Sequence, residues 1–266
     1  MGLHVPSRLK PLVSTIRASF KNRGALVPPR HLIDLVGGGD FGVIGDEYIE
    51  YFMTLGGLKP HHRVLDVGSG CGRMAVPLMG RISDEGGYWG FDILKEGVRW
   101  CKRKITSKRP NFHFFVSDIY NKTYNPTGKY RAHEFRFPYE DDFFDFVFLT
   151  SVFTHMLPPD MNHYLSEITR VLKPGARCLI TFFLLNAESR NNMKGPKSIF
   201  KFSYELDNCW AVREDIPEAA LAYDEDYIRG CLKAQGLKII DPIHFGSWSG
   251  RKEFLSSQDI VLASKP

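Results

Sequence analysis

The chain has few cysteines, and they form no recognisable pattern. There are five in 266 residues, an odd number, at Cys71, Cys101, Cys178, Cys209 and Cys231. No two of them form a Cys-x-x-Cys pair, so we expect neither a disulfide framework nor a metal site. Scattered thiols favour a reducing compartment, and the sequence therefore predicts a cytoplasmic protein.

Long apolar runs are also missing. The longest apolar stretch covers residues 143–157, contains Asp145, and is shorter than the about 20 residues needed to cross a bilayer. Residues 1–30 contain six basic residues and no acidic one, so the formal net charge of +5 leaves −1 for residues 31–266. A nearly neutral body argues against a broad nucleic-acid groove.

The N-terminal region divides into two parts. Residues 1–23 form a basic arm with apolar residues at helical spacing, interrupted by Pro11. We expect a packing arm or a basic tail, with a membrane-surface helix or a transit peptide as the alternative. Residues 24–58 predict two helices, one ended by Gly37–Gly39 and one from about residue 46 to 55, which together form either a lid beside a ligand or a plain helical turn.

A glycine-rich turn follows a short apolar segment. Residues 64–67 predict a buried strand, and Gly68, Gly70 and Gly72 then form a G-x-G-x-G turn before a helix. Glycines let the backbone approach a ligand closely, and the first N–H groups of a helix are free to bind one. No Lys-Ser or Lys-Thr follows, which excludes a phosphate-binding P-loop.

Strands and helices alternate after this turn. A second strand, residues 86–94, contains Asp92 about 20 residues past the turn, where an acidic side chain binds ribose hydroxyls. This alternation predicts a doubly wound α/β fold with a mostly parallel sheet. Further strands are expected over 111–120, 141–156 and 172–185, with helices over 95–107 and about 160–172.

Five segments resemble the motifs of class I S-adenosylmethionine-dependent methyltransferases in order and spacing. They are "VLDVGSGCG", "GFDI", "SDI", "FDFVFLTSVFTHM" and "RVLKPGA", within about residues 60–185. The resemblance implies a Rossmann-like, seven-stranded sheet of order 3-2-1-4-5-7-6 with strand 7 antiparallel, preceded by a helical extension. Residues 236–245 and 257–264 are the candidates for strands six and seven, so we expect the methyltransferase domain to cover residues 59–266.

The resemblance assigns the cofactor S-adenosyl-L-methionine and its contacts. Arg73 is expected to pair with the cofactor carboxylate, or else to be a surface arginine. The other residues expected at the methionine end are Asp66, Gly68, Ser69, Gly70, Gly72 and Thr150.

The adenosine end has its own expected contacts. By resemblance, Asp92 binds the ribose hydroxyls and Ile93 lies against the adenine face. Asp118 accepts a hydrogen bond from the adenine amino group, with the backbone of Ile119 beside it. The alternative for each aspartate is a helix cap or a turn.

For methyl transfer, the protein must align a nucleophile and exclude water. A base is needed only when the acceptor is a hydroxyl or a protonated amine. His155, just past the fourth strand, is the candidate base, because histidine titrates near neutrality. The alternative is a histidine that packs or caps its loop.

Two long insertions are expected to determine which molecule accepts the methyl group. Residues 119–140 and 186–222 follow the carboxyl ends of strands, where loops overhang a ligand crevice. An aromatic ring beside a guanidinium suits a polar acceptor, although the tryptophan of the pair could instead plug the edge of the sheet. The expected substrate-binding residues are Tyr120, Tyr204, Trp248 and Arg251.

The sequence thus predicts an enzyme that transfers a methyl group from S-adenosylmethionine to an oxygen or nitrogen of a small or medium-sized polar molecule. Two alternatives remain: methylation of RNA or another nucleic acid, and a cofactor-binding scaffold without turnover. The first lacks a polar-Pro-Pro-aromatic motif, since residues 157–160 read Leu-Pro-Pro-Asp. The scaffold alternative is disfavoured because every expected cofactor-binding position is intact.

Overall fold

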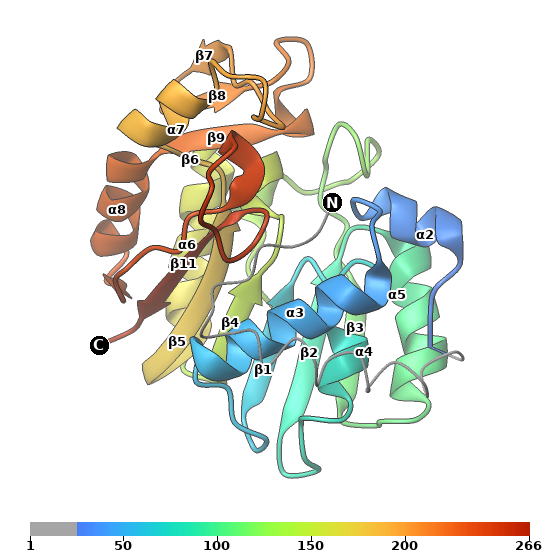
Figure 1. Ribbon diagram of the computed structural model, residues 1–266. Helices are drawn as coiled ribbons and strands as arrows, with labels where there is room; N and C mark the ends of the chain where they lie inside the picture. Colours follow the sequence, from blue (N-terminus) through green and yellow to red (C-terminus); the bar gives the residue numbers. More distant parts are fainter. Residues whose placement is uncertain (1–25) are drawn as a thin grey trace. The chain divides into compact units, whose positions relative to one another are not determined.

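The computed structural model of the chain describes residues 26–266, so the basic arm predicted over residues 1–23 lies outside the described residues. The strands form a mostly parallel seven-stranded sheet in the order β10-β11-β5-β4-β1-β2-β3 (Figure 1). With β10 counted as strand 6 and β11 as strand 7, this is the predicted order 6-7-5-4-1-2-3. Strand β11 runs antiparallel to β5, as expected. The α/β fold predicted from the sequence is therefore confirmed.

The seven strands of this sheet are β1 (Arg63–Val67), β2 (Gly87–Asp92), β3 (Phe112–Val116), β4 (Phe144–Leu149), β5 (Leu172–Phe182), β10 (Lys238–Ile239) and β11 (Asp259–Ser264). The α-helices are α2 (Arg30–Leu35), α3 (Phe41–Thr54), α4 (Ala75–Leu78), α5 (Lys95–Cys101), α6 (Pro158–Val171), α7 (Ala187–Asn192) and α8 (Glu225–Ala234). Helix α5 continues as one π-helical segment, η2 (Lys102–Thr106). Among the described residues, no helix is both long and apolar enough to cross a membrane.

The described chain forms two compact units. The N-terminal unit comprises residues 26–118 and 144–148, and the C-terminal unit comprises residues 119–143 and 149–266. Each unit is described separately below.

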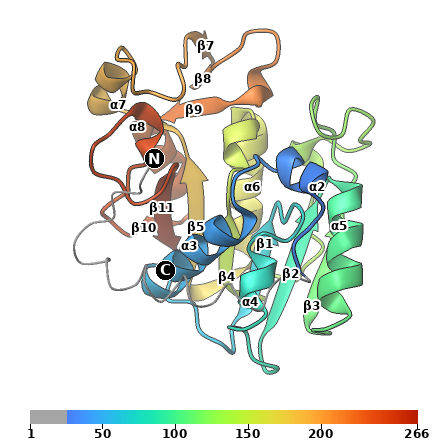
Figure 2. The same ribbon diagram turned by 45° about the vertical axis from the view of Figure 1, so that its right-hand side comes forward.

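Parallel strands with aromatic side chains build the N-terminal unit. Strand β1 pairs in parallel with β2 and with β4, and β2 pairs in parallel with β3. Helix α3 packs on this sheet through Phe52, whose ring centroid lies 5.5 Å from that of Phe146 and 4.3 Å from that of Phe148. Figure 2 shows α5 alongside β3, which it contacts.

Helix α3 begins at Phe41, five residues before the predicted start near residue 46. Asp40 causes the difference, because its Oδ1 accepts hydrogen bonds from the N–H groups of Gly42 and Val43 and so caps the helix. Asp40 directly follows Gly37–Gly39, and its role as a helix cap was not predicted from the sequence.

The C-terminal unit contains a second sheet that the sequence did not predict. Its four strands are ordered β6-β9-β8-β7 and come largely from the insertion over residues 186–222. They are β6 (Leu184–Leu185), β7 (Tyr204–Leu206), β8 (Cys209–Ala211) and β9 (Leu221–Asp224). A cluster of buried side chains, including Phe183, Phe202 and Trp248, packs there. The insertion is therefore folded, around an apolar core that includes Phe183, Leu185 and Trp248 from outside it.

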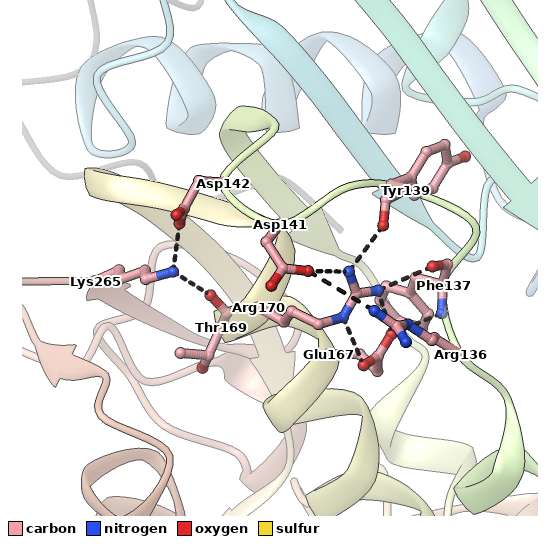
Figure 3. A network of polar contacts seen from close by, with 9 residues as sticks. All are labelled: Arg136, Phe137, Tyr139, Asp141, Asp142, Glu167, Thr169, Arg170 and Lys265. Carbon is pink, nitrogen blue, oxygen red and sulfur yellow. Dashed lines mark hydrogen bonds and ion pairs between the residues drawn. The ribbon is translucent and has the colours of Figure 1, made fainter.

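A polar network holds the end of the insertion over residues 119–140 in place. The Arg170 guanidinium donates to the carbonyl oxygens of Phe137 and Tyr139 and to the carboxylates of Glu167 and Asp141 (Figure 3). Its side chain is only 16% exposed. A planar guanidinium with several donors suits this task, since it binds backbone and carboxylate acceptors together. Residues 137–141 are thereby tied to helix α6.

Candidate cofactor site and acceptor-side residues

The glycine-rich loop after β1 has the backbone that its sequence predicts. Gly68, Gly70 and Gly72 adopt φ angles of 86°, 54° and 83°, a region that side chains disfavour. The N–H groups of Gly68 and Ser69 both lie within 3.0 Å of the carbonyl oxygen of Phe91. The loop is thus bound to the carboxyl end of β2.

Asp92 connects the same two elements through its side chain. Its Oδ2 accepts a hydrogen bond from the N–H of Gly70 at 2.6 Å, and its Oδ1 accepts one from the N–H of Leu94 at 2.8 Å. Burial raises the pKa of the Asp92 carboxyl, and these two backbone donors oppose the rise. Ile93, between Asp92 and Leu94 in the chain, is half-buried.

Asp66, near the end of β1, is only 1% exposed. The hydroxyl of Tyr88 donates a hydrogen bond to its Oδ2, while Oδ1 has no partner. Burial raises the pKa of the Asp66 carboxyl to about 8. Leaving a buried carboxyl oxygen without a partner costs free energy, so this position is suited to a polar ligand.

Unpartnered buried polar atoms gather around this loop. Among the described residues six such side-chain atoms occur, and four of them are Oδ1 of Asp66, Oγ of Ser69, Nε of Arg73 and Oγ of Ser117. Native proteins leave few buried polar groups unsatisfied. These orphaned donors and acceptors fit a ligand that has amino, carboxylate and hydroxyl groups, as S-adenosylmethionine does.

Ser117 was not among the residues predicted from the sequence. It follows β3, precedes the predicted adenine contact Asp118, and is 2% exposed. Its N–H donates to the carbonyl oxygen of Asp92 at 3.0 Å, which brings the ends of β2 and β3 together. A small polar residue directly before Asp118 was the available signal.

The predicted lid contacts the glycine-rich loop. A guanidinium nitrogen of Arg73 donates to the carbonyl oxygen of Gly38 at 2.6 Å, and burial lowers the pKa of Arg73. A Cβ atom at Gly70 would come within 2.9 Å of the Val36 side chain. These contacts are compatible with a cover over the loop, and the lid function stays a prediction. Arg73 is half-buried and not the freely exposed surface arginine of the alternative interpretation.

The remaining predicted cofactor contacts fall in both units. Asp118 is half-buried at the end of the N-terminal unit. Ile119 is 4% exposed and bridges to Tyr130 in the C-terminal unit, and Thr150, just after β4, is half-buried there. Their contacts with a cofactor stay predictions.

His155 ends the short 3-10 helix η4 (Phe153–His155) of the C-terminal unit. Its Nδ1 lies 2.8 Å from the carbonyl oxygen of Glu218, and the edge of the Tyr124 ring meets it at a centroid distance of 5.7 Å. Burial lowers the pKa of His155, so the neutral ring predominates at neutral pH. A neutral ring that donates from Nδ1 keeps Nε2 as a proton acceptor.

Three of the four predicted substrate-binding residues have exposed or polar surroundings. The Tyr120 ring lies under the guanidinium of Arg131 at 4.4 Å, and Tyr204 is 42% exposed. Arg251 forms an ion pair with Glu188 and lies over the ring of Phe245.

Trp248 requires a correction. It is 1% exposed, packs against Phe183 and Phe202, and donates from Nε1 to Oδ2 of Asp259 at 2.8 Å. A ring enclosed in this way has no free face for a substrate. This packing gives Trp248 a structural role, within an apolar cluster and not specifically as the predicted plug at the edge of the sheet, and we leave Trp248 out of the acceptor site.

Comparisons with known proteins agree with this geometry. Residues 64–175 match the family model of a methyltransferase domain. The demethylmenaquinone methyltransferase of Bacillus mycoides is 28% identical over 131 residues, which are 48% of this chain and 48% of that protein. The chain thus matches about half the length of this curated relative.

Solved structures share the fold. A SAM-dependent methyltransferase from Methanosarcina mazei superposes with a TM-score of 0.53 at 20% identity, over 78% of this chain and 94% of that one. A SAM-dependent methyltransferase from Aquifex aeolicus gives a TM-score of 0.50 at 20% identity, over 95% and 98%. Residues 64–175 thus match a methyltransferase domain and the solved structures share the fold, and together with the glycine-rich loop these similarities support a class I S-adenosylmethionine-dependent methyltransferase with S-adenosylmethionine as its cofactor.

Proposed function

We propose that this protein transfers a methyl group from S-adenosylmethionine to an oxygen or nitrogen of a small or medium-sized polar molecule in the cytoplasm. The observation that carries the proposal is the set of unpartnered buried polar atoms around the glycine-rich loop, at Asp66, Ser69, Arg73 and Ser117. A binding site without its ligand is expected to leave such atoms unsatisfied.

In this proposal the N-terminal unit holds the cofactor. Asp66 and the glycine-rich loop bind the methionine end, and Arg73 exchanges its hydrogen bond with Gly38 for the cofactor carboxylate. Asp92 binds the ribose hydroxyls, and Asp118 the adenine amino group. When bound, the cofactor supplies a methyl group on a positively charged sulfur, which is already activated toward nucleophiles.

His155 acts as the general base for a hydroxyl acceptor. The Glu218 carbonyl holds the proton on Nδ1, so Nε2 is free to take the acceptor's proton as the new bond to carbon forms. Because burial lowers the pKa of His155, the ring is in the accepting state at neutral pH without further activation. An amine acceptor that is already neutral needs only alignment.

The acceptor is proposed to contact the insertions of the C-terminal unit. Tyr204 is exposed, and Tyr120 and Arg251 lie in polar surroundings beside Arg131 and Glu188, which suit a polar molecule. The near-neutral charge of residues 31–266 favours such a molecule over a nucleic acid.

The test is turnover of methyl-labelled S-adenosylmethionine with a panel of acceptors. The panel holds phenols, amines, carboxylates, demethylmenaquinone (the substrate that the curated relatives are named for) and total RNA. Label transfer to a small molecule together with formation of S-adenosylhomocysteine supports the proposal. Transfer to RNA alone favours the nucleic-acid alternative, and cofactor binding without any transfer across the panel favours a scaffold.

The matched control for the base is a second histidine of the same unit. Nε2 of His163 donates a hydrogen bond to the carbonyl oxygen of Phe135, and His163 has no role in the proposed reaction. His155→Ala is expected to lose turnover that His163→Ala retains, at equal cofactor affinity. Equal activities of the two variants would remove His155 from the mechanism.

A further inference from the structure

Tyr88 lies on β2, next to β1, and has no role in the proposed function. It is completely buried in β2, one strand away from Asp66 on β1, and its hydroxyl donates to Oδ2 of that carboxyl group. A fully buried hydroxyl that donates to a 1% exposed carboxyl gives a hydrogen bond shielded from water.

The Tyr88 ring has little freedom to move. It stacks on Phe112 at a centroid distance of 5.0 Å and an interplanar angle of 12°, and the tilted ring of Phe114 lies at 5.2 Å. The direction of the hydroxyl is therefore set by the packing of β2 against β3. Rigid packing behind a polar contact is what holds a binding group in a fixed geometry.

Gly90 makes room for this contact. A Cβ atom at that position would come within 3.0 Å of the Tyr88 hydroxyl and 2.8 Å of the Cβ of Ser69. A side chain larger than hydrogen would thus press on both the tyrosine and the loop. The glycine, the tyrosine and the carboxyl group form one arrangement across β1 and β2.

The two oxygens of Asp66 consequently differ. Oδ2 is occupied by Tyr88, while Oδ1 is buried without a partner. The other titratable groups that interact with this carboxyl are Asp92 on β2 and Cys101 on α5, and neither supplies a positive charge. A cation that reaches Oδ1 would therefore complete the site.

We propose that Tyr88 is a positioning residue, which holds the Asp66 carboxylate so that its open oxygen accepts a hydrogen bond from the ammonium group of the cofactor's methionine end. This inference rests on the proposed function, because it takes the ligand to be S-adenosylmethionine or its product. Tyr88 itself does not touch the ligand. Its contribution is to direct Asp66 and to favour the charged form of that carboxyl.

Burial and the Tyr88 hydrogen bond act in opposite directions on Asp66. Burial raises the pKa of the carboxyl to about 8, and the hydroxyl of Tyr88 lowers it. An ammonium ligand binds the ionised carboxylate, so binding must release a proton at neutral pH. Tyr88→Phe removes the donor, raises the pKa of Asp66 further, and leaves a larger fraction of the carboxyl protonated at pH 7.

The experiment is calorimetric titration of the full chain with S-adenosylhomocysteine between pH 6.5 and 9. This ligand carries the ammonium group and undergoes no transfer. Relative to the wild type at the same pH, Tyr88→Phe is expected to bind about 10-fold more weakly at pH 7, as for loss of a hydrogen bond to a charged group, and the difference is expected to shrink by pH 9. Asp66→Asn is expected to bind weakly, and its difference from the wild type is expected to grow as Asp66 ionises in the wild type.

The matched control is Tyr223→Phe. Tyr223 is also fully buried, and its hydroxyl donates to the carbonyl oxygen of Met156 in the C-terminal unit. This substitution removes a buried hydroxyl without changing the surroundings of Asp66. The affinity of the variant for S-adenosylhomocysteine is therefore expected to stay within about twofold of the wild type at every pH.

A measurement on the wild type does not depend on the folding of any variant. Titrations in two buffers with different heats of ionisation report the protons exchanged on binding. The inference requires release of a large fraction of one proton at pH 7, decreasing by pH 9. Absence of proton release, or a loss of affinity in Tyr88→Phe that is the same at every pH, would overturn it while leaving the proposed function intact. If the wild type does not bind S-adenosylhomocysteine, both proposals are wrong.

Discussion

Nδ1 of His155 lies 2.8 Å from the carbonyl oxygen of Glu218, so a neutral His155 carries its proton on Nδ1 and presents Nε2 as the acceptor. A backbone carbonyl can only accept a hydrogen bond, which removes the ambiguity between the two tautomers. Because the carbonyl belongs to the insertion over residues 186–222, this insertion takes part in orienting the candidate base.

His155→Ala is expected to lower turnover of a hydroxyl acceptor about 10²- to 10⁴-fold. Cofactor affinity should change little, because the proposed contact is with the acceptor. Raising the pH from about 6 to about 10 should restore part of the rate, since an ionised acceptor needs no base. Turnover rates of the wild type and the variant across this pH range distinguish a base from simple alignment. A loss of rate below about fivefold at every pH would show that alignment alone drives the reaction.

The Asp66 carboxyl makes the stability of the ligand-free protein depend on pH. Its pKa in the folded protein is raised from 3.8 to about 8, so the folded state holds the proton more tightly than the unfolded state. Stability of the wild type should therefore fall as the pH rises from about 4 towards about 8. Asp66→Asn does not ionise, and its amide oxygen is still able to accept from Tyr88.

We therefore expect the melting temperature of Asp66→Asn, relative to the wild type, to increase between pH 5 and pH 9. Calorimetric melts of both proteins without ligand measure this difference. A variant that is less stable than the wild type by a constant amount at every pH would show that Asp66 is ionised in the ligand-free fold. The gain in stability should accompany the loss of ligand affinity, as is common for residues of binding sites.

Arg170→Ala should destabilise the C-terminal unit by about 3 kcal/mol, because it removes several hydrogen bonds of a largely buried guanidinium. The acceptors that lose these bonds are the carbonyl oxygens of Phe137 and Tyr139 and the carboxylate of Glu167, which is 7% exposed and still accepts from the N–H of Phe137. Chemical denaturation measures the change. The control is Arg213→Ala, which breaks an exposed ion pair with Asp215 and should leave the denaturation midpoint unchanged. Equal midpoints for the two variants would mean that the network in Figure 3 does not contribute to stability.

The sequence was sufficient to predict the sheet because local signals and chain order act together there. The glycines at 68, 70 and 72 have positive φ angles, and strands alternate with helices along the chain after them. A parallel sheet with helical crossovers satisfies this pattern, and the strand order followed from the resemblance of the motifs.

The second sheet and the role of Trp248 could not be predicted in the same way. Strands β7 and β8 have three residues each, too few for a periodic signal. Trp248 is enclosed by Phe183 and Phe202, which are distant in the sequence, so its burial depends on tertiary packing. The Tyr88 contact with Asp66 likewise depends on the pairing of β1 with β2, and nothing local to Tyr88 indicates it.

A substitution of Asp92 is the sharpest test of whether the glycine-rich loop and the ends of β1 to β3 bind S-adenosylmethionine. Calorimetric titration of the wild type should give saturable binding at one site. Asp92→Ala should weaken this binding about 10- to 100-fold while the protein remains folded by circular dichroism, because charge-assisted hydrogen bonds to the ribose are lost. An unchanged dissociation constant in Asp92→Ala, or no binding by the wild type, would contradict the account.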